Sequence, residues 1–270
     1  MSRTVVMIHG MFSRPWVWEH YVPRFEARGW RCLTPVLRHH DHEPSEPAPE
    51  ALGATSVLDY ADDLEAAIRE LPEAPVVVGH SMGGLLAQML AARGVASAAV
   101  LLTPAAPAGI VGISPAVIRS FAGILLTPGF WKKPVVPSWR AARYGLLNGF
   151  PDEAESREVY RRLVHESGRA VFEIGLWPLD RRRAARVDAA AVRCPVLVIG
   201  AEHDRATPPG VVRRIARRYR GAEHHEIAGA AHWVLAQPGW EAVADLVLDW
   251  LERTVPDSPA PAAGHPGRGD

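Results

Sequence analysis

Cysteine is almost absent from the sequence: the 270 residues contain only Cys32 and Cys194. Two thiols cannot build the disulfide framework of a small secreted domain, and we expect both to be reduced and to lie in the core. Long apolar runs are missing as well. No stretch approaches the ~20 residues that cross a bilayer, and the first ten residues lack a signal-peptide core. These absences predict a cytoplasmic protein without a membrane span.

The chain also lacks a surplus of charge of either sign. Its 30 basic residues balance 30 acidic ones. Nucleic acids and anionic membranes select proteins with a standing basic surplus, so we expect no nucleic-acid partner. Hydrophobic residues make up 48% of the chain, enough for a sizeable core. No pattern in the sequence indicates an oligomeric state.

Candidate strands and helices alternate in both halves of the chain. The candidate strands are residues 4–8, 31–34, 75–78, 98–102, 195–200 and 223–227. Segments with helical spacing of apolar residues separate most of them, which predicts parallel pairing with right-handed crossovers. We therefore expect an α/β fold with a mostly parallel, six-stranded sheet flanked by helices.

The alternation stops between residues 104 and 186, where no convincing strand is found. Helical stretches are predicted at residues 115–126, 138–147, 152–166 and 169–177. An all-helical insertion between two strands of one sheet is typical of a cap. We expect residues 1–103 and 187–255 to form the core and residues 104–186 to form this cap. The tail, 256–270, has no aliphatic side chain larger than alanine and should be disordered.

A G-x-S-x-G motif, Gly79-His80-Ser81-Met82-Gly83, lies between a predicted strand and a predicted helix. In that context a sharp turn lifts the serine hydroxyl above the carboxyl edge of the sheet. A serine hydroxyl is a weak nucleophile at neutral pH, so it needs a base and the base needs an orienting acid. The motif therefore predicts a nucleophile elbow with Ser81 as the reacting residue.

Asp204 and His232 each follow a later predicted strand, in the order serine, acid, histidine. Because carboxyl ends of parallel strands share one edge, these side chains are expected to converge on Ser81. A helix-capping aspartate and a core histidine are the plain alternatives. Backbone N–H groups of Met11 and Met82 are the candidate oxyanion donors, since Met11 follows His9-Gly10 and Met82 follows the serine.

These motifs resemble the α/β-hydrolase family, in particular capped members with a single-glycine oxyanion loop. The resemblance covers approximately Thr4 to Leu251 and implies Ser81 as nucleophile, Asp204 as acid and His232 as general base. The chain begins at what resembles the family's third strand, without the leading antiparallel hairpin. Residues 37–42 also stand where relatives often carry D-x-R-G-x-G.

We expect a serine hydrolase, with no cofactor, that cleaves a small-molecule carboxylic ester with an apolar portion through an acyl-enzyme. Thioesterase, lactonase or C–C hydrolase activity, cofactor-free haloperoxidase or perhydrolase activity, and a non-catalytic ligand-binding regulator are the alternatives. Serine at position 81 disfavours dehalogenases and epoxide hydrolases, which use a carboxylate nucleophile. Candidate pocket residues are Phe12, His80, Trp139, Phe150 and Trp233.

The cluster His39, His40, Asp41 and His42 raises the possibility of a metal site, because imidazole and carboxylate bind zinc. Adjacent ligands in one loop rarely surround a single ion, and no cysteine or second histidine pair completes the set. We expect a solvated loop flanking the active site, and no metal.

Overall fold

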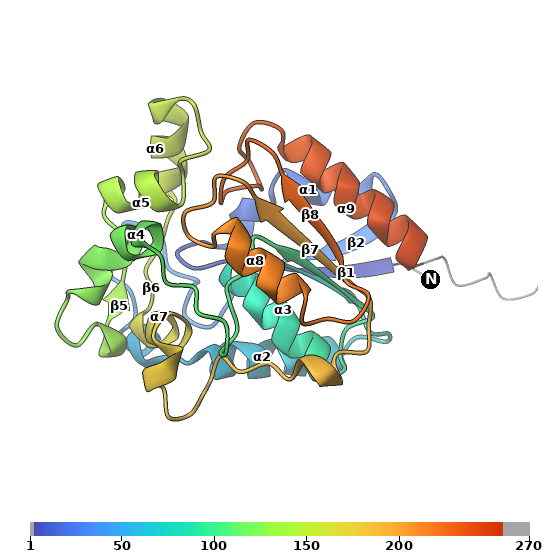
Figure 1. The fold of residues 1–270 in the computed structure, drawn as a ribbon, viewed down its shortest axis with the longest axis horizontal. Coiled ribbons are helices and arrows are strands. Elements are labelled where there is room, and N and C mark those ends of the chain that lie inside the picture. The colour runs from blue at the N-terminus through green and yellow to red at the C-terminus, as the bar shows by residue number, and fades with distance from the viewer. Residues whose placement is uncertain (1–2, 256–270) are drawn as a thin grey trace, which may run out of the picture.

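Six strands form the central sheet of the computed structural model, which describes residues 3–255 (Figure 1). They are β1 (Arg3–Ile8), β2 (Trp30–Leu33), β3 (Val76–His80), β4 (Ala98–Leu102), β7 (Val196–Ala201) and β8 (Glu223–Ile227). Their order is β2-β1-β3-β4-β7-β8, and every neighbouring pair is parallel. The predicted six-stranded sheet is confirmed.

Helices cover both faces of the sheet. One face packs against α1 (Tyr21–Glu26) and α9 (Trp240–Thr254), and the other against α2 (Val57–Arg69), α3 (Met82–Ala92) and α8 (Pro209–Ala216) (Figure 1). Alternate strand residues point to opposite faces, so Val5 and Met7 join the first core while Val6 and Ile8 join the second. The sheet is therefore buried on both sides, as parallel sheets usually are.

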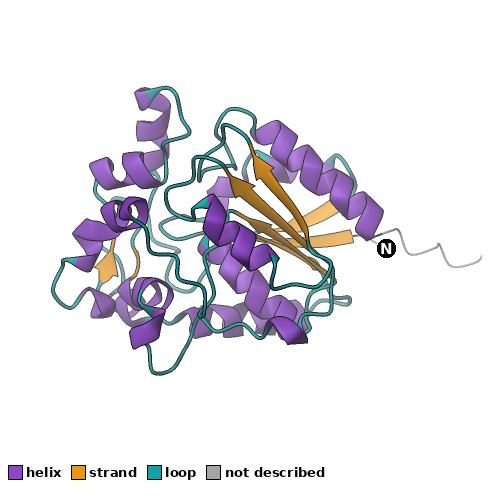
Figure 2. Cartoon of the chain, in the orientation of Figure 1, coloured by secondary structure: helices purple, strands orange, loops and turns teal. Residues whose placement is uncertain are grey.

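Between β4 and β7 the chain leaves the sheet, and we call residues 103–195 the insertion. It contains α4 (Pro115–Leu125), α5 (Trp139–Gly145), α6 (Glu153–Arg161), α7 (Gly168–Gly175), β5 (Pro134–Val135) and β6 (Glu166–Ser167), with short 3₁₀ turns between some of them. The strand arrowheads point toward the insertion (Figure 2). It therefore lies at the carboxyl end of the sheet, where ligands bind in open α/β folds.

The insertion is not all-helical, and that part of the prediction is wrong. β5 and β6 pair in an antiparallel manner over two residues each. Ser167 anchors this pair to the core, because its Oγ donates to the Thr55 carbonyl oxygen at 2.6 Å. Two-residue strands carry no hydrophobic alternation, so periodicity could not find them. Between β1 and β2 the chain forms a 3₁₀ turn at Pro15–Trp18, followed by α1.

Two buried carboxylates of the insertion hold it to the core. Glu166 accepts a hydrogen bond from the Tyr60 hydroxyl at 2.7 Å, and its other oxygen lies 3.2 Å from His40 Nε2. Glu173 accepts hydrogen bonds from Ser56 Oγ at 2.7 Å and from the Val57 N–H at 2.9 Å. Buried charges are tolerated only when they are paired in this way, so these contacts fix where the insertion sits.

The two cysteines are free, and both are partly buried. None of the helices in residues 3–255 is long and apolar enough to cross a membrane. The tail predicted to be disordered, residues 256–270, lies outside the described part of the chain.

Candidate active site

Ser81 lies on the sharp turn between β3 and α3. Its backbone has φ 55° and ψ −117°, a conformation that costs a non-glycine residue of order 1 kcal/mol or more. Close packing holds the turn in place: a Cβ added at Gly83 would lie 2.1 Å from the carbonyl oxygen of Ile8. The glycine thus allows α3 to lie directly against β1, and the strained serine sits at the start of the helix.

Asp204 and His232 come together at the ends of β7 and β8. The distance from His232 Nδ1 to Asp204 Oδ2 is 2.8 Å, and both side chains are buried. The other oxygen, Asp204 Oδ1, accepts from the N–H groups of Ala206 and Thr207, each at 2.8 Å. Because Asp204 accepts a hydrogen bond from Nδ1–H, Nε2 is the ring nitrogen left for a ligand.

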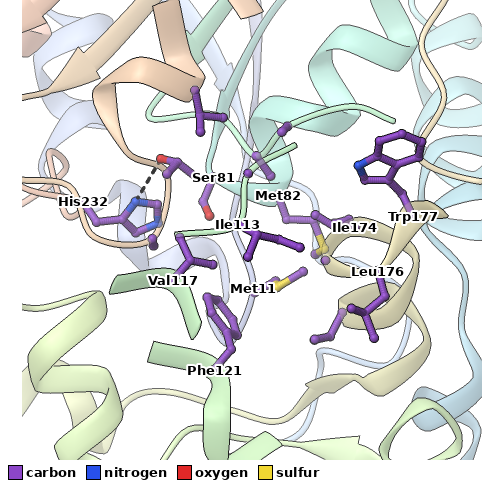
Figure 3. Close-up of a pocket in the computed structure, with 18 of the residues that line it drawn as sticks. Met11, Ser81, Met82, Ile113, Val117, Phe121, Ile174, Leu176, Trp177 and His232 are labelled. Carbon is purple, nitrogen blue, oxygen red and sulfur yellow. Dashed lines mark hydrogen bonds between the residues drawn. The ribbon is translucent and has the colours of Figure 1, made fainter. Parts of the chain in front are cut away.

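Ser81 and His232 line the same cavity and lie on the same side of it in Figure 3. No hydrogen bond joins their side chains in the described structure. In ligand-free enzymes such bonds are often long and tighten only when substrate binds. Of the three residues that the sequence predicts as a triad, the structure joins two by a hydrogen bond and places the third beside them.

His80, next to Ser81, is held in its neutral form. Its Nε2 donates to the His232 carbonyl oxygen at 2.9 Å, and burial, followed by the nearby His232 ring, lowers the pKa of His80 to about 3. The Thr103 hydroxyl donates to the same carbonyl oxygen at 3.1 Å. These two hydrogen bonds fix the backbone of His232. Because both donors are neutral, Asp204 remains the charged group in contact with the His232 ring.

The predicted oxyanion donors belong to residues near Ser81. A Cβ on Gly10 would lie 2.9 Å from Ser81 Cβ, so the loop carrying Met11 runs directly past the serine. Met82 is the first residue of α3, where the N–H group has no acceptor within the helix. Both residues line the cavity together with Ser81. An anion bound there would face backbone donors and the positive end of a helix.

The cavity around Ser81 has a volume of about 370 Å³. Predicted pocket residues Phe12, His80 and Trp233 line it. The insertion supplies most of its apolar wall: Val117, Phe121 and Leu125 from α4, and Ile174, Leu176 and Trp177 from α7 and the turn after it (Figure 3). These residues were missed, although the three on α4 follow the i, i+4 spacing of one helix face.

Trp139 and Phe150 do not line this cavity, which corrects the prediction for both. Trp139 packs edge-on against Tyr160 at a ring separation of 5.3 Å, and the Arg157 guanidinium lies 4.4 Å from its ring centre. Phe150 is buried in the hydrophobic core. Both aromatics pack inside the structure away from the cavity, and which way a side chain faces could not be taken from composition.

The histidine loop is not solvated throughout, contrary to expectation. His40 and His42 are buried, and His40 contacts the Arg38 carbonyl oxygen at 3.1 Å as well as Glu166. Although burial opposes a charge there, the Glu166 carboxylate raises the pKa of His40 above its ordinary value. Within residues 3–255, no three His, Cys, Asp or Glu side chains are grouped so that they could hold a metal ion.

Comparisons with known proteins show which family the chain resembles. The model of the alpha/beta hydrolase family matches residues 5–246. The chain is 30% identical over 267 residues to a monoacylglycerol lipase of Mycolicibacterium smegmatis, covering 92% of this chain and 87% of the lipase. It is 29% identical over 244 residues to a Mycobacterium tuberculosis protein provisionally named non-heme bromoperoxidase BpoC. The match covers 84% of this chain and 86% of that protein.

A solved structure shares the fold. The monoacylglycerol lipase of Paleococcus ferrophilus superposes with a TM-score of 0.67 at 21% sequence identity, over 93% of this chain and 94% of the lipase.

Proposed function

The chain belongs to the α/β hydrolase family, and on this basis we propose that it is a serine hydrolase that cleaves carboxylic esters with an apolar portion. The observation that carries the proposal is the meeting of three features at one cavity. These are the strained turn at Ser81, the Asp204–His232 hydrogen bond of 2.8 Å, and an apolar wall supplied by the insertion.

In the proposed reaction, Ser81 Oγ attacks the ester carbonyl carbon while His232 Nε2 accepts the hydroxyl proton. His232 then returns this proton to the departing alcohol oxygen, which leaves an acyl group on Ser81. Water attacks the acyl-enzyme in the same manner, and the acid and free Ser81 are released. Asp204 keeps the imidazole in the required tautomer and stabilises the imidazolium, because its carboxylate accepts a hydrogen bond from Nδ1–H.

The N–H groups of Met11 and Met82 are proposed to bind the oxygen that becomes negative in the tetrahedral intermediate. Backbone donors of this kind are rigid, so they stabilise the developing charge without reorganising during the reaction. Their position next to Ser81 is supported by the close approach of Gly10 to the serine and by the start of α3.

The apolar wall favours a substrate whose acyl or alcohol group is a hydrocarbon. Valine, isoleucine, leucine and phenylalanine side chains offer no hydrogen bonds to polar groups. Each substrate CH₂ that they shield from water stabilises binding by about 0.8 kcal/mol. The lipase relatives are named for acylglycerol substrates, which have hydrocarbon chains of this type.

A second candidate function is perhydrolysis, in which hydrogen peroxide replaces water in attack on the acyl-enzyme. The relative provisionally named as a bromoperoxidase favours this candidate. Peracid formation from acetate or from an ester in the presence of peroxide would measure it with the same protein sample.

The test is reaction with a fluorophosphonate probe together with turnover of p-nitrophenyl esters of increasing acyl length. Ser81→Ala should abolish labelling and lower kcat by about 10⁴-fold or more while the protein still folds. Ser138→Ala is the matched control, because Ser138 caps α5 outside the cavity. Labelling at another residue, or normal turnover by Ser81→Ala, would contradict the assignment.

A further inference from the structure

An arginine-rich groove adjoins the pocket that contains Ser81. The groove has a volume of about 420 Å³ and is lined by Arg183, Arg186, Arg218, Trp177 and Asp188, with small apolar residues between them. Trp177 also lines the Ser81 pocket, and in Figure 3 it lies across that pocket from His232. A substrate that is bound at Ser81 and extends past Trp177 would enter this groove.

Two arginines of the groove have no carboxylate partner within residues 3–255, unlike several other arginines of the surface. Arg38 pairs with Asp63, Arg162 with Glu19 and Arg213 with Glu226. Among the described residues, in contrast, the exposed guanidinium groups of Arg183 and Arg186 form no ion pair.

The third guanidinium of the groove is held at its wall. Arg218 donates to the carbonyl oxygens of Ala108 and Val187, at 3.3 and 2.8 Å. Asp188 supplies a carboxylate on the same wall, and its Oδ1 accepts from the Ala190 N–H. Three guanidinium groups against one carboxylate leave an excess of positive charge in a concave site, which concentrates anions.

The turn that carries Arg183 is tightly organised. Asp180 is buried, and its two oxygens accept from the N–H groups of Arg182 at 3.1 Å and Ala184 at 2.7 Å. Arg183 lies within this turn at φ 51°, in the left-handed region that disfavours residues other than glycine. The fold thus keeps a charged side chain at a strained position on the wall of the groove.

We propose that this groove is an anion subsite, which binds a carboxylate or phosphate at the far end of an apolar ester substrate. The proposal rests on the proposed function at Ser81 and adds a substrate class to it: an ester with a hydrocarbon segment and a terminal oxyanion. The hydrocarbon segment occupies the apolar pocket, and the oxyanion lies beyond Trp177. Guanidinium groups suit either oxyanion because their paired N–H donors match two oxygens at once.

Matched esters test the proposal. We would compare kcat/KM for p-nitrophenyl decanoate with that for the p-nitrophenyl half-ester of decanedioic acid and for the ester whose acyl chain ends in phosphate. The wild-type protein should prefer at least one anionic ester by about tenfold at low ionic strength, a factor equal to 1.4 kcal/mol. The preference should shrink as added salt screens the exposed charges. The two anionic esters distinguish carboxylate from phosphate.

The double variant Arg183→Gln/Arg186→Gln should lose most of this preference, while its kcat/KM for the neutral ester stays unchanged. The matched control is Arg181→Gln/Arg182→Gln, which removes the same charge from the same turn at exposed residues that do not line the groove. The control should keep the preference. Equal rates for neutral and anionic esters in the wild type, or an equal loss in both double variants, would overturn the proposal.

Binding without turnover separates this proposal from the proposed function. Calorimetry with octyl phosphate, octanoate and 1-octanol should show tighter binding of at least one anion, and this difference should be lost in Arg183→Gln/Arg186→Gln but not in the control. If no ester is hydrolysed, the proposed function fails while this measurement still decides the subsite. No difference between the anions and 1-octanol would overturn the subsite itself.

Discussion

The carboxyl end of the sheet and the insertion contribute to the same cavity in different ways. At the sheet end the backbone fixes the geometry: Ser81 and Phe12 have positive φ, and a Cβ at Gly83 would collide with β1. The insertion contributes aliphatic side chains, and some of its apolar groups remain exposed, such as Ile113 at 55% and Leu126 at 81%. Backbone geometry tolerates little change, whereas an apolar wall can be repacked. We therefore expect the proposed reaction chemistry to depend mainly on the sheet end, and substrate fit to depend mainly on the insertion.

After Ser81→Ala, the largest effect should come from Asp204→Asn at the sheet end. An asparagine amide cannot hold the Nδ1–H tautomer of His232 in place of the carboxylate that now accepts at 2.8 Å. We expect kcat for p-nitrophenyl esters to fall by about 10³- to 10⁴-fold. Asp188→Asn is the matched control, because Asp188 caps a 3₁₀ turn in the insertion and should leave kcat for neutral esters unchanged. An active Asp204→Asn enzyme would show that another acid serves this role.

A glycine-to-alanine pair compares the two regions directly. At Gly83 a new Cβ would meet the carbonyl oxygens of Ile8 and His9, at 2.1 and 2.7 Å, so α3 must move away from β1. We expect Gly83→Ala to lower the free energy of unfolding by about 3 kcal/mol or more. At Gly123, on the exposed face of α4, nothing lies within 4 Å of a new Cβ. Gly123→Ala should therefore raise the free energy of unfolding by about 1 kcal/mol.

Urea denaturation of both variants measures this comparison. Equal losses of stability would mean that the insertion is packed as tightly as the elbow, and the distinction between the two regions would fail.

The same contrast explains what the sequence could predict. The elbow is encoded locally: a buried strand, G-x-S-x-G and a helix follow one another within 20 residues, so the turn could be placed from residues 75–92 alone. Asp204 and His232 could be found because each follows a strand whose carboxyl end must lie at one edge of the sheet. Local patterns of this kind do not depend on how distant segments pack.

The insertion was less predictable because its arrangement depends on distant contacts. Glu166 meets His40 across 126 residues of chain, and no local pattern marks either residue as a partner of the other. Which aromatic faces the cavity depends on how each helix is rotated against the core. Phe121 faces it and Trp139 does not, although both lie on helices of the insertion.

His80 at the sheet end and His40 at the junction with the insertion should give opposite pH dependence of the free energy of unfolding. For His80, burial lowers the pKa in the folded state to about 3. Between about pH 6.5 and pH 3 the unfolded state therefore binds a proton that the folded state excludes. The free energy of unfolding should fall by about 1.4 kcal/mol for each pH unit below 6.5 because of this residue. His9, whose pKa burial also lowers to about 3, should add a similar slope.

His40, at the junction with the insertion, should act in the opposite sense. Burial opposes its charge, but Glu166 raises the pKa of His40 above 6.5 in the folded protein. Its contribution to stability should be complete below pH 6.5 and should be lost as pH rises through the folded-state pKa. Urea denaturation at a series of pH values from about 5 to about 9 gives the free energy of unfolding as a function of pH. His80→Gln should make this curve flatter on the acidic side, and His40→Gln should make it flatter on the alkaline side. Identical profiles for both variants would contradict the assigned directions.

The smallest effect should be a change in the preferred acyl length when side chains of the insertion are altered. Phe121 and Ile174 both line the cavity of about 370 Å³, so Phe121→Ala should enlarge it and Ile174→Trp should shorten it. Each CH₂ that fits contributes up to about 0.8 kcal/mol, or about fourfold in kcat/KM, until the chain meets the wall. Phe121→Ala should therefore shift the optimum toward longer p-nitrophenyl esters and Ile174→Trp toward shorter ones, with fluorophosphonate labelling of Ser81 preserved. Trp139→Phe is the control, because Trp139 packs against Tyr160 and should leave the optimum in place. A shift caused by Trp139→Phe and not by Ile174→Trp would mean that the acyl chain follows a different path through the insertion.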